Sequence, residues 1–310
     1  MTRITIIPGT ANDGTDLTAV YAENTAANVA FALIFPGKAL PRFVHWGRPL
    51  PHPETLVHLY DALKPQRVSG ALDNTAWPSI LPTQSEAWIG AQRIDIRRDG
   101  RETFCDFSVV AISPAVGDNE GASMISVDAQ DADQQVALHW TCELTDSGLI
   151  RQSATVTNLG DGDMPCALGC HTALVCPQRL RISSGHTCLD VPPPRHLPTG
   201  HTLDWHGDGA DGAWFDPAPL RVSRHFRSVG DPLAELDYGS FRLTYRPDPQ
   251  FTWWMLWKPS PDCGFICPEP MNIPVNAHRN HLDALPVTAA GQTTTFVSVI
   301  ELTEIPVTVG

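Results

Sequence analysis

Two residues of this sequence have the chemistry and the local setting of an acid–base pair. Glu269 lies between Pro268 and Pro270, and each proline fixes its own φ at about −65° and pushes the preceding residue toward an extended conformation. The prolines therefore predict a rigid turn after a buried apolar strand, which would hold the carboxylate in one position. His171 lies in a run of small and apolar residues, 165–174. A restrained carboxylate together with an imidazole in apolar surroundings is typical of general acid–base chemistry.

Each of these residues also has a plainer interpretation. A single histidine in an apolar run is more often a hydrogen-bonded core residue than a catalytic one. A Pro-Glu-Pro segment is more often a surface turn. Neither residue alone decides between the two interpretations.

Size and composition favour one large β domain. The chain has 310 residues, 42% of them hydrophobic, and a single domain spanning 1–310 is expected. Its 28 prolines and 23 glycines predict many turns and few long helices. A formal charge of −13 speaks against binding to nucleic acid or to anionic membrane surfaces, both of which need basic clusters.

The sequence lacks obvious targeting segments. No apolar run approaches the roughly 18 residues that span a bilayer. Residues 1–8 carry neither the apolar segment nor the cleavage site of a signal peptide, so a cytoplasmic location is expected.

The eight cysteines include two pairs with four-residue spacing, Cys166 with Cys170 and Cys263 with Cys267. Zinc sites usually have closer pairs in polar loops, whereas these pairs lie in apolar, strand-like runs. Buried free thiols are the favoured interpretation, and a cytosolic setting disfavours disulfides.

The hydrophobic pattern predicts short antiparallel strands. Val136–Leu144 alternates apolar and polar residues, a turn follows at Thr145–Gly148, and Leu149–Thr157 is the returning strand. The only clear helix signal covers residues 53–63. Segment 176–235 is the least regular and is expected to form loops over a sheet. The other expected strands are 3–7, 29–35, 41–46, 92–98, 104–112, 123–128, 166–175, 241–246, 251–257, 263–267 and 294–303.

In this order, the segments resemble the aldose 1-epimerase (galactose mutarotase) family. Residues 144–165 resemble a family hairpin, and Ala167–His171 is similar to the strand that bears the family's catalytic acid. Phe265–Met271 resembles the strand that bears the catalytic base. The resemblance is best over residues 136–310 and implies an all-β fold, a galactose mutarotase-like β-supersandwich of large antiparallel sheets with few short helices.

The N-terminal third also resembles the β-supersandwich domain of bacterial α-galactosidases, in His45–Leu50, the helix at 53–63 and residues 71–82. In those enzymes the catalytic residues lie in a barrel that follows this domain, so the two resemblances agree on architecture and differ on activity. The mutarotase motif with a first histidine corresponds to Trp88–Arg93, where Ile89 stands in place of that histidine.

The mutarotase resemblance implies the chemistry of sugar ring opening without a metal or nucleotide cofactor. Glu269 would take the proton of the anomeric hydroxyl, and His171 would protonate the ring oxygen. Asp216 would hold sugar hydroxyls, although an aspartate before proline also caps turns. Arg93 could bind hydroxyls or a carboxylate, and could equally be a charge at a strand edge.

Aromatic residues add weak support for a small-molecule carbohydrate ligand, because ring faces stack on the C–H faces of pyranoses. Trp77 and Trp88, in expected loops, are the favoured ligand contacts. On a strand, Trp253 and Trp257 would share one face and Trp254 would take the other.

Three functions fit these patterns. The first is an aldose 1-epimerase acting on a free sugar, which the ordered His171 and Glu269 favour. The second is a non-catalytic carbohydrate-binding protein on the same fold, which Ile89 favours. The third is an isomerase or lyase that acts on a modified sugar.

Overall fold

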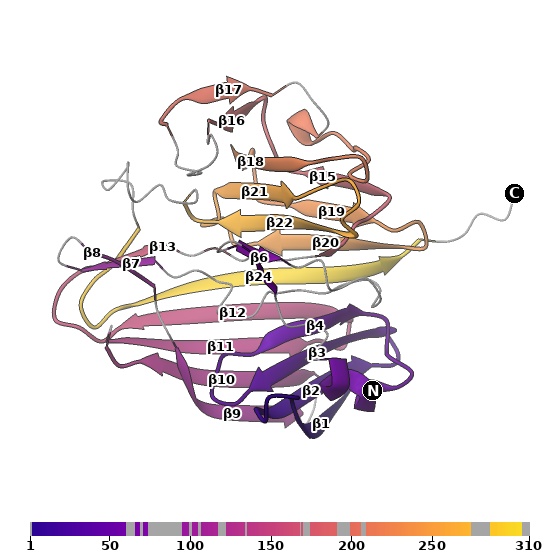
Figure 1. Cartoon of the computed structure of the whole chain (residues 1–310), viewed down its shortest axis with the longest axis vertical. Helices are drawn as coiled ribbons and strands as arrows, with labels where there is room; N and C mark the ends of the chain where they lie inside the picture. Colours follow the sequence, from indigo (N-terminus) through magenta and orange to yellow (C-terminus); the bar gives the residue numbers. More distant parts are fainter. Residues whose placement is uncertain are drawn as a thin grey trace, which may run out of the picture.

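The computed structural model consists mainly of antiparallel β-strands (Figure 1). It describes residues 2–59, 66–68, 71–73, 95–98, 101–104, 107–116, 122–133, 135–167, 169, 174–190, 199–205, 209–273 and 286–305. The helical elements in these ranges are 3-10 turns at Pro53–Thr55 (η1) and Ala210–Gly212 (η2) and an α-helix at Leu56–Leu59 (α1). None of the helices in the described residues is long and apolar enough to cross a membrane.

The largest sheet has eight strands in the order β15-β19-β20-β24-β12-β11-β10-β9. Their bounds are Arg179–Ile182 (β15), Ala234–Asp237 (β19), Phe241–Pro247 (β20), Thr293–Glu304 (β24), Leu149–Asn158 (β12), Val136–Leu144 (β11), Ser123–Asp131 (β10) and Ser108–Val116 (β9).

Two further sheets cover one face of this large sheet, one over each half (Figure 1). The first has the order β14-β22-β21-β18-β16-β17, and the second has the order β1-β2-β3-β4. Bounds in the six-stranded sheet are Leu174–Val175 (β14), Phe265–Met271 (β22), Trp253–Lys258 (β21), Val222–Arg227 (β18), Thr187–Leu189 (β16) and Thr202–Asp204 (β17). The N-terminal sheet contains Thr2–Thr10 (β1), Asp16–Asn24 (β2), Val29–Pro36 (β3) and Arg42–Gly47 (β4).

The remaining strands form two small sheets. One has the order β23-β13-β7-β8, and the other pairs β5 with β6. Their bounds are Val287–Thr288 (β23), Met164–Ala167 (β13), Asp95–Arg98 (β7), Arg101–Phe104 (β8), Gln66–Val68 (β5) and Ala71–Asp73 (β6).

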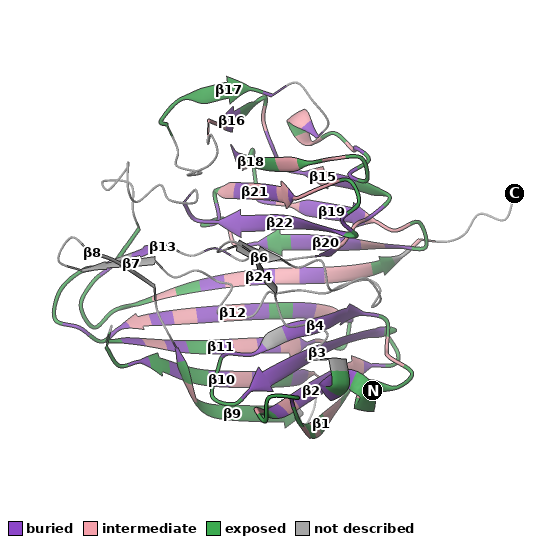
Figure 2. Ribbon diagram, viewed as in Figure 1, coloured by how far each residue is buried: buried purple, intermediate pink, exposed green. Residues whose placement is uncertain are grey.

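A chain of aromatic rings joins the three large sheets. Trp46 of β4 lies edge-on to Tyr245 of β20, with ring centroids 6.5 Å apart, and Tyr245 contacts Trp254 of β21 at 6.1 Å. All three side chains are almost completely buried. Such edge-to-face pairs add roughly 0.5–1.5 kcal/mol each beyond the burial of their area. One continuous hydrophobic core therefore underlies both covering sheets, and Figure 2 shows β3 buried along its whole length.

The hairpin of β11 and β12 confirms the strand prediction at residue level. The apolar positions of Val136–Leu144 are at most 1% exposed, while the residues between them are half-buried or exposed. The turn uses Gly148, whose φ of 83° is accessible to glycine at little cost.

Three strand predictions are wrong. Residues 104–112 were expected to form one strand, but β8 ends at Phe104 and β9, which begins at Ser108, belongs to a different sheet. Residues 166–175 were expected to form one strand, but β13 and β14 belong to different sheets. Segment 176–235 was expected to form loops, but five strands, β15 to β19, begin within it. These strands are only three to six residues long, too short for alternation to show in the sequence.

The predicted helix at 53–63 is described only as far as Leu59. There, η1 and α1 cover the outer face of the N-terminal sheet. Leu56 and Val57 pack into a second hydrophobic cluster with alanines of β2 and β3.

Candidate functional site

Glu269 lies within a strand, and the predicted turn is wrong. Strand β22 continues through both prolines, and Glu269 is paired with Met255 of β21. On its other side, β14 pairs only with Phe265 and Ile266, which precede the prolines. Proline is tolerated in a sheet where no neighbouring strand needs its N–H, so the two prolines and an extended backbone are compatible.

The two faces of the six-stranded sheet have different environments. On one face, side chains enter the main core; these include Phe226, Trp254, Leu256 and Ile266. The opposite face, here called the site face, carries Ser223, His225, Arg227, Trp253, Met255, Trp257, Phe265, Cys267, Glu269 and Met271. Phe265, Cys267 and Trp257 form a separate small cluster on it, consistent with this division.

Glu269 belongs to a cross-strand row on the site face. Met255 is directly opposite Glu269 on one side and His225 of β18 on the other. Two strand spacings of about 4.8 Å place the backbones of Glu269 and His225 about 10 Å apart. Glu269 is 6% exposed and His225 2%, whereas Met255 between them is only partly buried. A carboxylate and an imidazole therefore flank a partly exposed thioether.

Two indoles lie along the same strand as Met255. Trp253 and Trp257 are partly buried on the site face, while Trp254 points into the core, as the alternation predicts. The guanidinium of Arg227 lies over the ring of Trp253 at 4.9 Å. Trp257 contacts Phe265 with ring centroids 5.8 Å apart. These side chains form an aromatic strip next to Glu269.

Asp216 is exposed, and its Oδ1 accepts the backbone N–H of Ala218 at 2.8 Å. This is the turn-capping contact that the sequence allowed as an alternative. The charge of Asp216 also affects the pKa of the Cys176 thiol. Burial raises its pKa to about 11, while the ammonium of Lys258 lowers it and Asp216 raises it further. The role of Asp216 in binding sugar stays a prediction.

Four of the predicted site residues, His171, Arg93, Trp77 and Trp88, lie outside the described residues. His225 and Arg227 were missed, because segment 222–227 was read as loop. A strand there would have placed both on one face by simple alternation. Their pairing with β21 had no signal in the sequence.

The cysteine prediction is confirmed where the structure describes it. Cys166, Cys263 and Cys267 are buried cysteines that form no disulfide, and Cys170 lies outside the described residues. In the described ranges, no group of three or more His, Cys, Asp or Glu residues could hold a metal ion.

Comparison with solved structures identifies the architecture. A galactose mutarotase-like protein from Clostridium acetobutylicum aligns with a TM-score of 0.65 and 12% identity, over 97% of this chain and 99% of that one. The chain has the galactose mutarotase-like fold. Another protein of this fold, galactose 1-epimerase from Lactobacillus acidophilus, aligns with a TM-score of 0.63 and 12% identity, over 98% of this chain and 99% of that one.

The second resemblance is also supported. Residues 39–167 match the model of the glycosyl hydrolase family 36 N-terminal domain. A family 36 α-galactosidase from Geobacillus stearothermophilus aligns with a TM-score of 0.52 and 10% identity, over 96% of this chain but only 41% of that one. No curated protein matches the sequence. At these identities the mutarotase-like fold is shown, and the activity is a separate question.

Proposed function

We propose that this protein is an aldose 1-epimerase-like isomerase, which interconverts the α and β anomers of a free sugar by general acid–base ring opening. The observation that supports this best is the position of Glu269. Its carboxylate lies on the site face, next to an aromatic strip, within a strand that fixes its backbone. A base held in one place beside a ring-binding surface is what the reaction needs.

His171 is the proposed general acid, and it lies outside the described residues. Described residues before and after it pair with the strand that carries Glu269: Gly169 pairs with Met271, and Leu174 pairs with Ile266. These two pairs support the role proposed for His171.

The proposed reaction needs one proton transfer at each end of the breaking bond. Glu269 takes the proton of the anomeric hydroxyl while His171 protonates the ring oxygen, so the C1–O5 bond breaks. The open-chain aldehyde rotates about C1–C2, and the two residues then exchange roles as the ring closes. Each such group contributes roughly 10²–10⁴-fold when well placed.

The aromatic strip is the proposed platform for the sugar ring. Trp253 and Trp257 flank Met255 and are partly accessible, so either indole can stack on the apolar C–H face of a pyranose. Asp216, Arg93, Trp77 and Trp88 remain proposed contacts to the rest of the sugar.

A non-catalytic carbohydrate-binding protein is the second candidate, and one sequence observation favours it. Ile89 replaces the first histidine of the mutarotase motif, so the contact which that residue supplies in mutarotases is missing. Such a protein would use the same aromatic strip without accelerating ring opening.

The test is the rate of anomerisation of freshly dissolved α-D-glucose and α-D-galactose, followed by polarimetry or NMR. Wild type is expected to accelerate the reaction, while Glu269→Gln and His171→Ala lose at least about 100-fold of the acceleration. Glu301→Gln is the matched control, because Glu301 pairs with Arg246 away from the site face. Sugar binding without acceleration by wild type would favour the binding protein, and full activity of Glu269→Gln would exclude the proposed base.

A further inference from the structure

We infer that the site face binds a sugar with an anionic substituent, a phosphate or a carboxylate, and that Arg227 binds this group. The inference rests on the proposed function, because it assigns a substrate class to the same site. Arg227 is the positively charged residue that the pairing of β18 and β21 adds to the site face.

The position of Arg227 suits the far end of a sugar whose anomeric carbon lies at Glu269. Arg227 is opposite Trp253, and Trp253 is opposite Met271, two residues beyond Glu269 on β22. Two strand spacings across and two residues along place the backbones of Arg227 and Glu269 about 12 Å apart. Both side chains stand on the site face, and this separation suits a hexose with a charged group distant from C1.

The contact with Trp253 orients the guanidinium. It lies 4.9 Å from the indole centroid, and Arg227 as a whole is exposed. A guanidinium stacked on a ring keeps its in-plane N–H groups available, and these match the oxygens of a phosphate or carboxylate in a bidentate geometry. His225 lies two residues earlier on the same strand and face, and it is 2% exposed.

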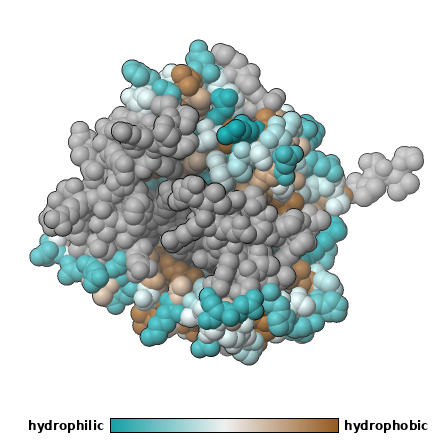
Figure 3. All heavy atoms as spheres, viewed as in Figure 1, coloured by the Kyte–Doolittle hydropathy of each residue, from teal (hydrophilic) through white to brown (hydrophobic). Residues whose placement is uncertain are grey.

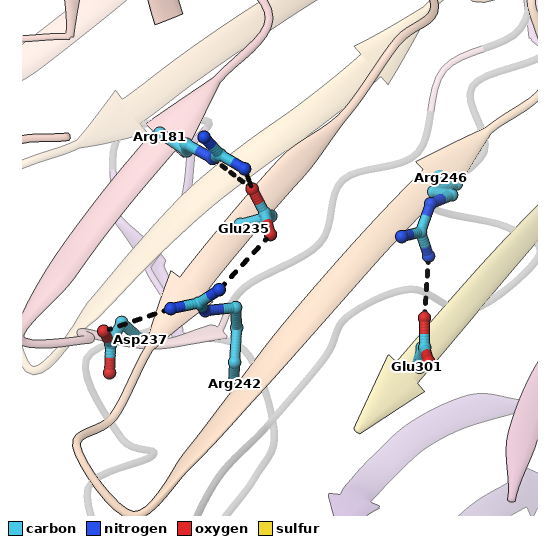
Figure 4. A network of polar contacts seen from close by, with 6 residues as sticks. All are labelled: Arg181, Glu235, Asp237, Arg242, Arg246 and Glu301. Atoms are coloured by element: carbon cyan, nitrogen blue, oxygen red, sulfur yellow. Dashed lines mark hydrogen bonds and ion pairs between the residues drawn. The ribbon is translucent and has the colours of Figure 1, made fainter. Parts of the chain in front are cut away.

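Several arginines of the large sheet are paired with carboxylates (Figure 4), whereas Arg224 stacks on Trp205 and contacts the thiol of Cys188. On the large sheet, Arg181 binds Glu235, Arg242 lies 3.8 Å from Asp237, and Arg246 lies 2.9 Å from Glu301. In contrast, no carboxylate in the described ranges forms an ion pair with Arg227. With 34 acidic and 21 basic side chains in the sequence, carboxylate partners are abundant. An arginine without one on the site face is therefore suited to an anionic ligand.

The experiment is equilibrium binding by calorimetry or ligand-observed NMR at low ionic strength, where exposed charges are screened least. Three ligands share one ring: galactose, galactose 6-phosphate and galacturonate. A parallel glucose series covers the other common configuration. The proteins are wild type, Arg227→Gln, Arg227→Lys and Arg224→Gln. Arg224 is the matched control because it lies on the same strand and stacks over Trp205 at 5.7 Å, but points to the opposite face of the sheet.

Wild type is expected to bind at least one anionic sugar about tenfold more tightly than its neutral parent, since charge-assisted hydrogen bonds are stronger than neutral ones. Arg227→Gln should bring the two ligands within about twofold of each other, and Arg224→Gln should keep the wild-type preference. Arg227→Lys keeps the charge without the bidentate geometry and should give an intermediate value. Comparison of the phosphate and carboxylate arms identifies which anion the site prefers.

Equal affinity of wild type for neutral and anionic sugars would overturn the inference. So would a preference that persists in Arg227→Gln, or no binding of any anionic sugar. The proposed catalytic function fails separately: if wild type binds anionic sugars selectively but does not accelerate their anomerisation, the substrate class stands and the isomerase does not. Glu269→Gln should lose the acceleration and keep the anion preference.

Discussion

At the scale of single residues, the buried charge of Lys258 stabilises the strands that carry the candidate site, from the face of the sheet opposite the site face. Its side chain is fully buried, and its ammonium donates to the backbone carbonyls of Ala218 (3.0 Å), Leu220 (3.4 Å), Ser260 (2.7 Å) and Pro261 (2.9 Å). These carbonyls come from the segment before β18 and from the turn after β21. One side chain therefore joins the ends of the two strands that carry His225 and the aromatic strip.

Removal of this ammonium should destabilise the protein strongly. Lys258→Met keeps most of the side-chain volume but leaves buried carbonyl oxygens without their donor, so we expect a loss of about 3 kcal/mol in the free energy of unfolding. Urea unfolding measures the change, and Lys38→Met at an exposed position is the control. Equal unfolding midpoints for the two variants would contradict a structural role for Lys258.

At the scale of elements, the two faces of strand β21 are expected to have different roles: one face contributes to stability and the other to sugar binding. Trp254 is fully buried in the main core, so Trp254→Ala should cost about 3–5 kcal/mol of stability. Trp257 is partly buried on the site face, so Trp257→Ala should cost less stability and should weaken sugar binding. Thermal unfolding and sugar titration of both variants test this division. If Trp254→Ala weakened binding more than Trp257→Ala while still folded, the assignment of the faces would be wrong.

Strand alternation explains what the sequence could predict of this fold. The long hairpin at Val136–Asn158 was predictable because one face is core and the other faces solvent. Strand β18 was not, because His225 and Phe226 are both buried although they point to opposite faces. The prolines predicted a restrained backbone at Glu269, but they indicated a turn where the structure has an extended strand. The alignment of Glu269 with Met255 and His225 was not predictable, because register depends on pairing between distant segments.

At the scale of the whole molecule, protonation of His45 makes the free energy of unfolding depend on pH. His45 is fully buried in β4, and its Nε2 is 2.7 Å from the carbonyl oxygen of Arg48. Burial disfavours the charged imidazole and lowers its pKa from 6.5 to about 4, although the bond to Arg48 acts in the opposite direction. Its strand packs on the main core and beneath α1, so unfolding of the core would expose it to protonation.

The unfolded chain binds a proton at His45 below pH 6.5, whereas the folded protein does so only below about pH 4. The contribution of His45 to the free energy of unfolding is therefore fully present above pH 6.5. It declines by about 3 kcal/mol in total as the pH falls toward 4. His45→Gln keeps an N–H donor but cannot titrate. Urea unfolding of both proteins between pH 7 and pH 4 should show a steeper loss in the free energy of unfolding for wild type. The carboxylates that titrate in this range affect both proteins, so the difference between the two curves reports on His45. Parallel curves would mean that His45 becomes charged without unfolding, through local opening of the N-terminal sheet.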